Sequence, residues 1–458
     1  TVESSETYHN VYGGNTEGTG TPESEKGNSR KNRVTLKNAI MDNLYGGSTD
    51  FTNGEATDNT VTITGGKVNG SVYGGFSASG KSIRNTVNLG DGEHAMTGGY
   101  SLGRIFGGNQ SSDVTGNTLN VNTNVKADNI LHFDKIRFQK NDSFAAGTPL
   151  LELNGGVQTT IKNLSNIEIE GFLGKYIVMK NTYGITITDG GAPLSNTTGN
   201  REKNLKKVGT DKILYEMYQF KDVDATQATA TVDGTNRYAG RSKAGNSTID
   251  NKLTIDTSDT YDEVAGGSTT GTGTTASEKG NSRNNHVTLK RGTVNNNLYG
   301  GSTDFTSGEA TDNSVTITGG QVNGHVYGGY SASGKTIRNT VNLGDGVNAM
   351  TAGYHLDEIY GGNQADVAGN TLNVKTNVEA KNIKNFEKIR FQKNDSFVST
   401  VPLLKLTDAL GTTIQSLTNI EMEGFLGKYT IMENAAGITI SDGGAPLSNT
   451  TGNREKNL

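Results

Sequence analysis

The sequence predicts an all-β protein, an elongated β-solenoid with coils of about 26–32 residues. Three observations predict it. Short strands that alternate apolar and polar residues recur at regular spacing, Gly-rich turns follow them, and no stretch has the period of an amphipathic helix. Repeats of this length with two or three strands each are typical of solenoids, in which every repeat packs on its neighbours.

The composition indicates a thin, continuous core. Gly accounts for 63 of 458 residues, about twice the usual share, whereas hydrophobic residues make up only 31%. The net charge of −5 comes without a basic block, so nucleic acid is not an expected partner. The absence of Cys excludes disulfides, thiol catalysis and Cys-ligated metals. No apolar run is long enough to span a membrane.

A large repeat divides the chain into two units. The segment 184–205 returns at 437–458 with one difference, Thr188 against Ser441, which fixes an offset of 253 positions. We therefore predict a first repeat unit at 1–253 and a second, truncated unit at 254–458. An irregular connecting segment is expected at about 206–247. Because the chain starts and stops within the repeat, we expect a longer parent protein.

Within each unit, an Asn that precedes a β-branched run begins the first short signature. Successive copies are separated by 27, 26 and 32 residues in the first unit and by 28, 26 and 31 in the second. Side-chain amides that recur once per coil can stack at the strand spacing of about 4.8 Å, so we expect an Asn ladder. The Asn residues are Asn32, Asn59, Asn85, Asn117, Asn285, Asn313, Asn339 and Asn370.

A second signature, of the form Val/Ile/Leu-Tyr-Gly-Gly, lies between the Asn-led strands. Its glycines are expected at corners, where φ is positive or backbones crowd. Alternation from an inward Val, Ile or Leu would point its aromatic residue outward. The aromatic residues of the signature are Tyr12, Tyr45, Tyr73, Phe106, Tyr299, Tyr327 and Tyr360, and Phe76, Tyr100, Tyr330 and Tyr354 lie near them in sequence.

These aromatic residues allow two interpretations. They form a self-packing ladder that stiffens one face, or an exposed stack that binds sugar rings by its apolar faces and hydroxyls. The candidate ligand-binding residues are Tyr45, Tyr73, Phe76, Tyr299, Tyr327, Tyr330 and Tyr360.

The segments 75–82 and 329–336 match the P-loop pattern G-x-x-x-x-G-K-S/T. A working P-loop leads into a helix N-terminus, whereas another strand pattern follows here, so we interpret both segments as coil corners and expect no nucleotide. None of the six His residues recurs at the matching position of the other unit. The sequence also lacks a calcium-binding Gly-Gly-x-Gly-x-Asp repeat. We therefore expect no catalytic residues, no metal and no cofactor.

The Asn-led strands, the Tyr-Gly-Gly turns and the segment NFEKIRF at 385–391 together resemble passenger domains of bacterial autotransporter adhesins. The resemblance implies a right-handed parallel β-helix, display at the outer membrane and an adhesive or stalk role. The expected function is that of a non-enzymatic extracellular bacterial surface protein. Expected partners are host or bacterial surface glycans or proteins, and other copies through end-to-end self-association. Alternative hypotheses are a self-assembling filament subunit and a polysaccharide-degrading β-helix enzyme.

Overall fold

A computed structural model of the chain describes residues 1–18, 27–93, 102–112, 114–145, 147–271, 280–347, 355–451 and 454–458. The protein is all-β, and its helices within these residues are two short 3-10 turns, η1 (Leu164–Asn166) and η2 (Leu417–Asn419). Neither is long and apolar enough to span a membrane. By its internal contacts the chain divides into two compact units. Unit 1 comprises Thr1–Asn196 and Lys203–Met217, and unit 2 comprises Thr197–Glu202 and Tyr218–Leu458.

In unit 1 the chain passes in turn through three stacks of parallel strands. The first stack contains the start of β4 with β6, β9, β11, β13 and β16, and the second contains β1, the end of β4, β7, β10, β12, β14 and β17. Short strands form the third stack, β3–β5–β8 and then β15–β18. Antiparallel β21 pairs with β17 and is followed by β20 and β19. The bounds are β1 (Val2–Tyr12), β2 (Asn15–Thr16), β3 (Ser29–Arg30), β4 (Arg33–Thr49), β5 (Ala56–Thr57), β6 (Thr60–Ile63), β7 (Lys67–Ser77), β8 (Ser82–Ile83), β9 (Thr86–Leu89), β10 (Leu102–Phe106), β11 (Thr118–Val121), β12 (Val125–Leu131), β13 (Lys135–Gln139), β14 (Leu151–Leu153), β15 (Thr159–Ile161), β16 (Ile167–Glu170), β17 (Gly174–Asn181), β18 (Ile185–Ile187), β19 (Leu194–Thr198), β20 (Arg201–Val208) and β21 (Lys212–Gln219).

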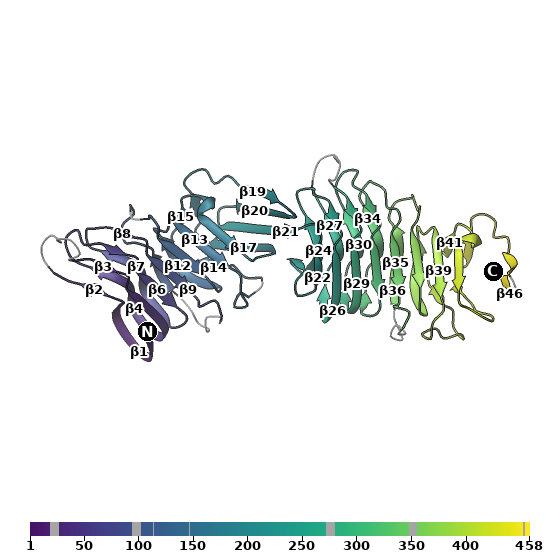
Figure 1. Ribbon diagram of the computed structural model, residues 1–458, viewed down its shortest axis with the longest axis horizontal. Helices are drawn as coiled ribbons and strands as arrows, with labels where there is room; N and C mark the ends of the chain where they lie inside the picture. Colours follow the sequence, from purple (N-terminus) through teal and green to yellow (C-terminus); the bar gives the residue numbers. More distant parts are fainter. Residues whose placement is uncertain are drawn as a thin grey trace. The chain divides into compact units, whose positions relative to one another are not determined.

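Unit 2 repeats this order, and its strands from β24 to β43 lie side by side in Figure 1. The first stack runs from β26 to β42, the second from β24 to β43, and the third contains β25–β28–β31 and then β41–β44. The bounds are β22 (Asp224–Thr226), β23 (Thr231–Asp233), β24 (Asn236–Ser242), β25 (Thr248–Ile249), β26 (Lys252–Tyr261), β27 (Val264–Thr269), β28 (Ser282–Arg283), β29 (His286–Val294), β30 (Leu298–Thr303), β31 (Ala310–Thr311), β32 (Ser314–Ile317), β33 (Gln321–Val322), β34 (Val326–Ser331), β35 (Thr340–Leu343), β36 (His355–Gly362), β37 (Thr371–Val374), β38 (Val378–Lys384), β39 (Lys388–Gln392), β40 (Leu404–Leu406), β41 (Thr412–Ile414), β42 (Ile420–Glu423), β43 (Met432–Asn434), β44 (Ile438–Ile440), β45 (Ser448–Thr451) and β46 (Arg454–Asn457).

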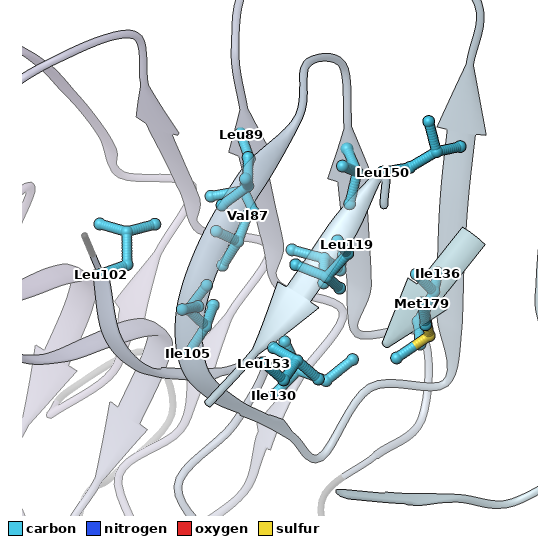
Figure 2. Packing of buried hydrophobic residues seen from close by; sticks show 14 of the residues in the cluster. Val87, Leu89, Leu102, Ile105, Leu119, Ile130, Ile136, Leu150, Leu153 and Met179 are labelled. Carbon is cyan, nitrogen blue, oxygen red and sulfur yellow. The ribbon is translucent and has the colours of Figure 1, made fainter. Parts of the chain in front are cut away.

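The apolar residue of each alternating strand points into a narrow core between the stacks. Figure 2 shows this in unit 1, where Val87 and Leu119 from the first stack and Ile105 and Ile130 from the second are buried together. The same positions pair directly from repeat to repeat, as Leu119 does with Val87 and with Ile136. Every repeat therefore adds the same few apolar side chains, which accounts for a core built from so small an apolar fraction.

The predicted Asn ladder is confirmed. The backbone N–H and the Nδ2 of Asn313 both donate to Oδ1 of Asn339, at 3.0 and 3.2 Å, and Nδ2 of Asn313 also donates to the Ser282 carbonyl at 2.8 Å. Each amide thus joins one repeat to the next and also holds the corner between the third and first stacks. The ladder residues with buried side chains are Asn59, Asn85, Asn117, Asn251, Asn285, Asn313, Asn339 and Asn370.

The residue before a ladder Asn turns this corner with a positive φ. Non-glycine residues have φ between 51° and 59° there, and glycine takes the place at Gly116 and Gly369. Side chains of these corners also pair across repeats: Arg84 forms an ion pair with Asp58 at 2.9 Å, Arg338 forms one with Asp312 at 2.7 Å, and Nδ2 of Asn284 donates to Oδ1 of Asp250 at 2.5 Å. The left-handed conformation recurs with the ladder, so both features are parts of one corner.

The glycines of the Tyr-Gly-Gly signature were expected at corners, but in β4, β7 and β30 they lie within the strands and none of the six has a positive φ. Close approach of neighbouring atoms is what requires them. A Cβ added at Gly329 would lie 2.5–2.7 Å from the side-chain atoms of Asn339. A Cβ at the preceding Gly328 would lie 2.7 Å from the carbonyl oxygen of Gly361 in the next repeat. The two sequence signatures are therefore one structural unit, because the second glycine makes room for the ladder Asn.

The segment expected to be irregular, about 206–247, is mostly strand. It contains β21 and the end of β20, and β22 to β24 lie in the part from 222 to 244. β24 pairs in parallel with β27, and Tyr238 lies opposite Ala265. The sequence NRYAGRS at 236–242 is a divergent copy of the second signature, with Ala in place of the first glycine. Because of this substitution, the repeat was not recognised from the sequence.

Candidate functional site

The aromatic residues of the second signature form two stacks. The first aromatic ladder comprises Tyr12, Tyr45, Tyr73 and Phe106, whose successive ring centroids are 4.7, 5.0 and 4.8 Å apart. Neighbouring rings are nearly parallel, with interplanar angles of 13°, 7° and 12°. The spacing follows from the strand register, which places each ring directly opposite the next.

The second aromatic ladder comprises Tyr299, Tyr327 and Tyr360 in unit 2. Their centroids are 5.3 and 4.7 Å apart, with interplanar angles of 14° and 17°. Tyr330 packs edge-on against Tyr299 and Tyr327, at 5.5 Å from each. In unit 1, Phe76 has the same position against Tyr45 and Tyr73. The structure therefore brings all seven predicted residues into two clusters, three in unit 1 and four in unit 2.

Exposure differs along the ladders. Tyr12 is 39% exposed, and most of the other ring residues are half-buried. Tyr299 departs from the outward position predicted for it, since only 8% of it is exposed. Tyr330 covers the Tyr299 ring, and the Tyr299 hydroxyl accepts a hydrogen bond from Nδ2 of Asn297 at 3.0 Å. Tyr100 and Tyr354 lie outside the described residues.

Stacking decides what the ladders can bind. A sugar that packs on an aromatic ring needs a free ring face. Tyr45 and Tyr73 each have a ring on both sides, so their faces are occupied. These inner rings offer only their edges and hydroxyl groups to a partner. Tyr12 lies at the end of its ladder, and one of its faces has no stacked ring among the described residues.

The hydroxyls of Tyr45 and Tyr327 remain protonated at neutral pH. Burial raises the pKa of Tyr45 to about 12, with further contributions from Tyr12, Tyr73 and Asp50. Burial raises the pKa of Tyr327 to about 12 as well, and neighbouring Tyr360 adds to the effect. The row of hydroxyls therefore consists of neutral groups that both donate and accept hydrogen bonds.

This pKa difference predicts a loss of stability in alkaline solution. The folded protein keeps the Tyr45 and Tyr327 protons up to about pH 12, whereas an unfolded chain releases them near pH 10.0. Below pH 10.0 both states are protonated, and above it the free energy of unfolding falls as pH rises toward 12. Denaturant titrations at about pH 9 and pH 11 should show a smaller fall for Tyr45→Phe/Tyr327→Phe than for the parent. Equal falls in the free energy of unfolding for the variant and the parent would contradict the assignment of the alkaline loss of stability to Tyr45 and Tyr327.

The second ladder ends in a charged cluster that the first lacks. Nζ of Lys384 contacts Oε1 of Glu358 at 2.8 Å and lies 5.4 Å from the Tyr360 ring centroid. The Tyr360 hydroxyl donates to Glu358, and this bond further raises the pKa of Tyr360 beyond the effect of burial. In the first ladder, Phe106 and Arg104 replace this tyrosine and glutamate. The two ladders therefore share their apolar stack and differ in charge.

The P-loop-like segment 75–82 runs from the end of β7 to the start of β8, so a strand and no helix follows it. Several of its backbone N–H groups already have protein acceptors. Ser77 N–H donates to Oδ1 of Asn109 at 3.0 Å, and Gly80 N–H donates to Oγ of Ser77 at 2.8 Å. Phosphate binding requires such groups to be free at a helix N-terminus, so this geometry favours a structural corner.

The histidines do not share an environment. Nδ1 of His9 is 2.6 Å from Oδ2 of Asp42, whereas Nδ1 of His286 is 2.6 Å from Oγ of Ser314. Burial, aided by Lys252, lowers the pKa of His286. His94 and the side chain of His355 lie outside the described part of the chain. Within that part, no group of three or more His, Asp or Glu side chains is placed to hold a metal ion.

Sequence analysis missed two residues of the ladders. Asn251 begins the Asn ladder of unit 2, because its Nδ2 donates to Oδ1 of Asn285 at 2.7 Å. Tyr238 lies in the register of the second aromatic ladder and packs in one cluster with Ala265 and Tyr299. The signal for Asn251 is its sequence NKLTI, which matches the first signature.

The comparisons with known proteins add no relative, since no family model, curated protein or solved structure matches the chain.

Proposed function

We propose that this chain is a non-enzymatic extracellular protein of the bacterial surface, an adhesin or stalk built on the plan of an autotransporter passenger. We infer that each unit is a right-handed parallel β-helix, a solenoid of short coils. The chain holds binding surfaces away from the cell, and repetition provides several contacts at once. Several weak contacts on one chain together bind more tightly than any one of them does alone.

The observation that supports this proposal is the repetition of identical contacts from repeat to repeat. The Asn ladder, the aromatic ladder and the apolar core each pass through successive repeats in one register. Such a unit lengthens by duplication without new kinds of contact. A long, rigid surface protein benefits from being able to lengthen by duplication. An enzyme instead needs one specialised groove.

The proposed contact surface is the outer edge of the two aromatic ladders. It offers tyrosine hydroxyls in a row. Hydroxyl rows suit the hydroxyl groups of glycans and the polar backbone of proteins. Because the ring faces of Tyr45 and Tyr73 are occupied, we expect hydrogen bonding rather than ring stacking along the ladder itself.

Adhesion by coated particles tests the proposal. Beads that carry the folded chain should be retained on bacterial or host cells, and beads that carry a scrambled-sequence protein of equal charge should not. The same preparation should release no reducing sugar from surface polysaccharides. Retention equal to that of the control beads, or turnover of a polysaccharide, would contradict the proposal.

A further inference from the structure

The third strand stack of unit 1 is interrupted at one repeat. The strands β3, β5 and β8 form the first part of this stack, and Thr115 extends it because its carbonyl accepts the Arg84 N–H at 3.0 Å. The stack then stops for one repeat and resumes at β15. The repeat between them passes from β12 to β13 through residues 132–134 alone, so it adds no strand to this stack. A groove of about 280 Å³ occupies this place, and we call it gap 1.

Unit 2 has the same interruption. The Ala368 carbonyl accepts the Arg338 N–H at 2.8 Å, residues 385–387 join β38 to β39, and the stack resumes at β41. The resulting groove, gap 2, measures about 300 Å³. Lining residues of the two gaps correspond at the repeat offset, namely Val114 with Val367, Phe133 with Phe386, and Ile136 with Ile389.

One wall of each gap is the open edge of a parallel strand. Within the described residues β15 pairs only with β18, and the Thr159 N–H and the Ile161 carbonyl bond to that strand, each at 3.0 Å. Because successive residues of a parallel ladder bond to opposite sides, the Thr160 N–H and carbonyl point toward gap 1. The same alternation at β41 points the backbone of Thr413 toward gap 2.

Each gap stands where the repeat pattern would place one strand. Strands of a sheet lie about 4.8 Å apart, so one missing strand leaves about 10 Å between the segments that flank it. Apolar side chains line the floor of both gaps, Ile130 and Phe133 in gap 1 and Ile383 and Phe386 in gap 2, but gap 2 exposes more polar than apolar surface. An extended segment in this space would continue the stack on one side and cover the apolar floor below.

The differences between the gaps indicate which interactions matter. At the rim of gap 1 lie His132 and Lys162, where gap 2 has Asn385 and Gln415. The strand edge and the apolar floor are common to both gaps, whereas most of the charge is not. A ligand that fits both gaps is thus recognised through backbone groups and apolar side chains rather than through an ionic contact.

We propose that each gap binds one extended polypeptide segment, which adds as a strand to the open edge of β15 or β41. This is the β-addition mode, in which main-chain hydrogen bonds provide affinity and the floor selects apolar side chains at alternate positions. The partner is a protein with an exposed, uncharged, β-branched segment. The inference rests on the strand edges alone and is independent of the proposed adhesive function.

A labelled peptide tests the proposal on the full chain. The probe is Tyr-Gly-Ile-Thr-Ile-Thr-Asp, the sequence at 183–189, which contains the strand that β15 pairs with on its other edge. Fluorescence anisotropy should show saturable binding with two equivalents per chain. Thr160→Pro removes an N–H that faces gap 1 and leaves the bonds to β18, so it should reduce binding to one equivalent. Adding Thr413→Pro should abolish binding.

Two controls separate strand addition from other causes. A peptide N-methylated at both Ile residues keeps its side chains but lacks two donors, and it should not bind. Val114→Trp/Val367→Trp fills both gaps without altering the strand edges and should also abolish binding, with circular dichroism unchanged. Absence of saturable binding to the folded parent would overturn the proposal. So would equal binding of the N-methylated peptide, or a surface oligosaccharide that occupies the gaps in place of the peptide.

Discussion

Asn339→Ala should destabilise unit 2 by about 3–5 kcal/mol. The side chain is fully buried, its Oδ1 accepts from Asn313, and its Nδ2 donates to the Ala310 carbonyl at 2.9 Å. Alanine would leave the Asn313 N–H and the Ala310 carbonyl buried without partners, and it would open a cavity beside them. Equilibrium unfolding in denaturant, followed by tyrosine fluorescence, measures the change in the free energy of unfolding.

Asn342→Ala is the matched control for this prediction. Asn342 lies three residues away on the outer side of the first stack, where its half-buried Nδ2 donates to Oγ1 of Thr316 at 3.1 Å. Water can replace that bond, so the expected loss is about 1 kcal/mol or less. Equal losses for the two variants would show that the buried ladder has no special role in stability.

Gly329→Ala should cost about 3 kcal/mol, although alanine is among the smallest side chains. The new Cβ would lie 2.5 Å from Nδ2 and 2.6 Å from Cγ of Asn339, closer than real Cβ atoms approach other atoms. The ladder Asn must then move away from its partners in both neighbouring repeats. The loss should appear in the same unfolding measurement.

The coupling between these two positions gives a sharper test. In the Asn339→Ala background the atoms that meet the new Cβ are gone, so Gly329→Ala should then cost about 1 kcal/mol or less. Strongly non-additive losses are therefore expected from this pair. Additive losses would contradict the conclusion that the second glycine of the signature exists to make room for the Asn.

The sequence predicted the parts of the fold that repeat with little variation. The Asn ladder follows from an amide at a fixed place before each strand, and the aromatic register follows from Tyr12, Tyr45 and Tyr73 at the same place in their turns. Both are local patterns that a parallel stack copies from repeat to repeat. Periodicity therefore indicated an all-β chain and the partners of these side chains.

What the sequence did not predict depends on packing between repeats. The burial of Tyr299 needs Tyr330 to fold over it, and stacking occupies the faces of Tyr45 and Tyr73. Alternation gives the direction of a side chain but not what covers it. The strand β24 was missed because Ala239 interrupts its signature, and β21 because this antiparallel strand carries neither signature.

Binding of the folded chain to a broad panel of surface glycans and surface proteins tests the central claim most directly. The account predicts saturable binding that Tyr45→Phe and Tyr73→Phe both weaken, because each variant removes a hydroxyl of the row. Tyr183→Ala, which removes an exposed tyrosine outside the ladders, should leave binding unchanged. A folded chain that binds nothing on the panel, or whose binding ignores the ladder variants, would contradict an adhesive role for these ladders.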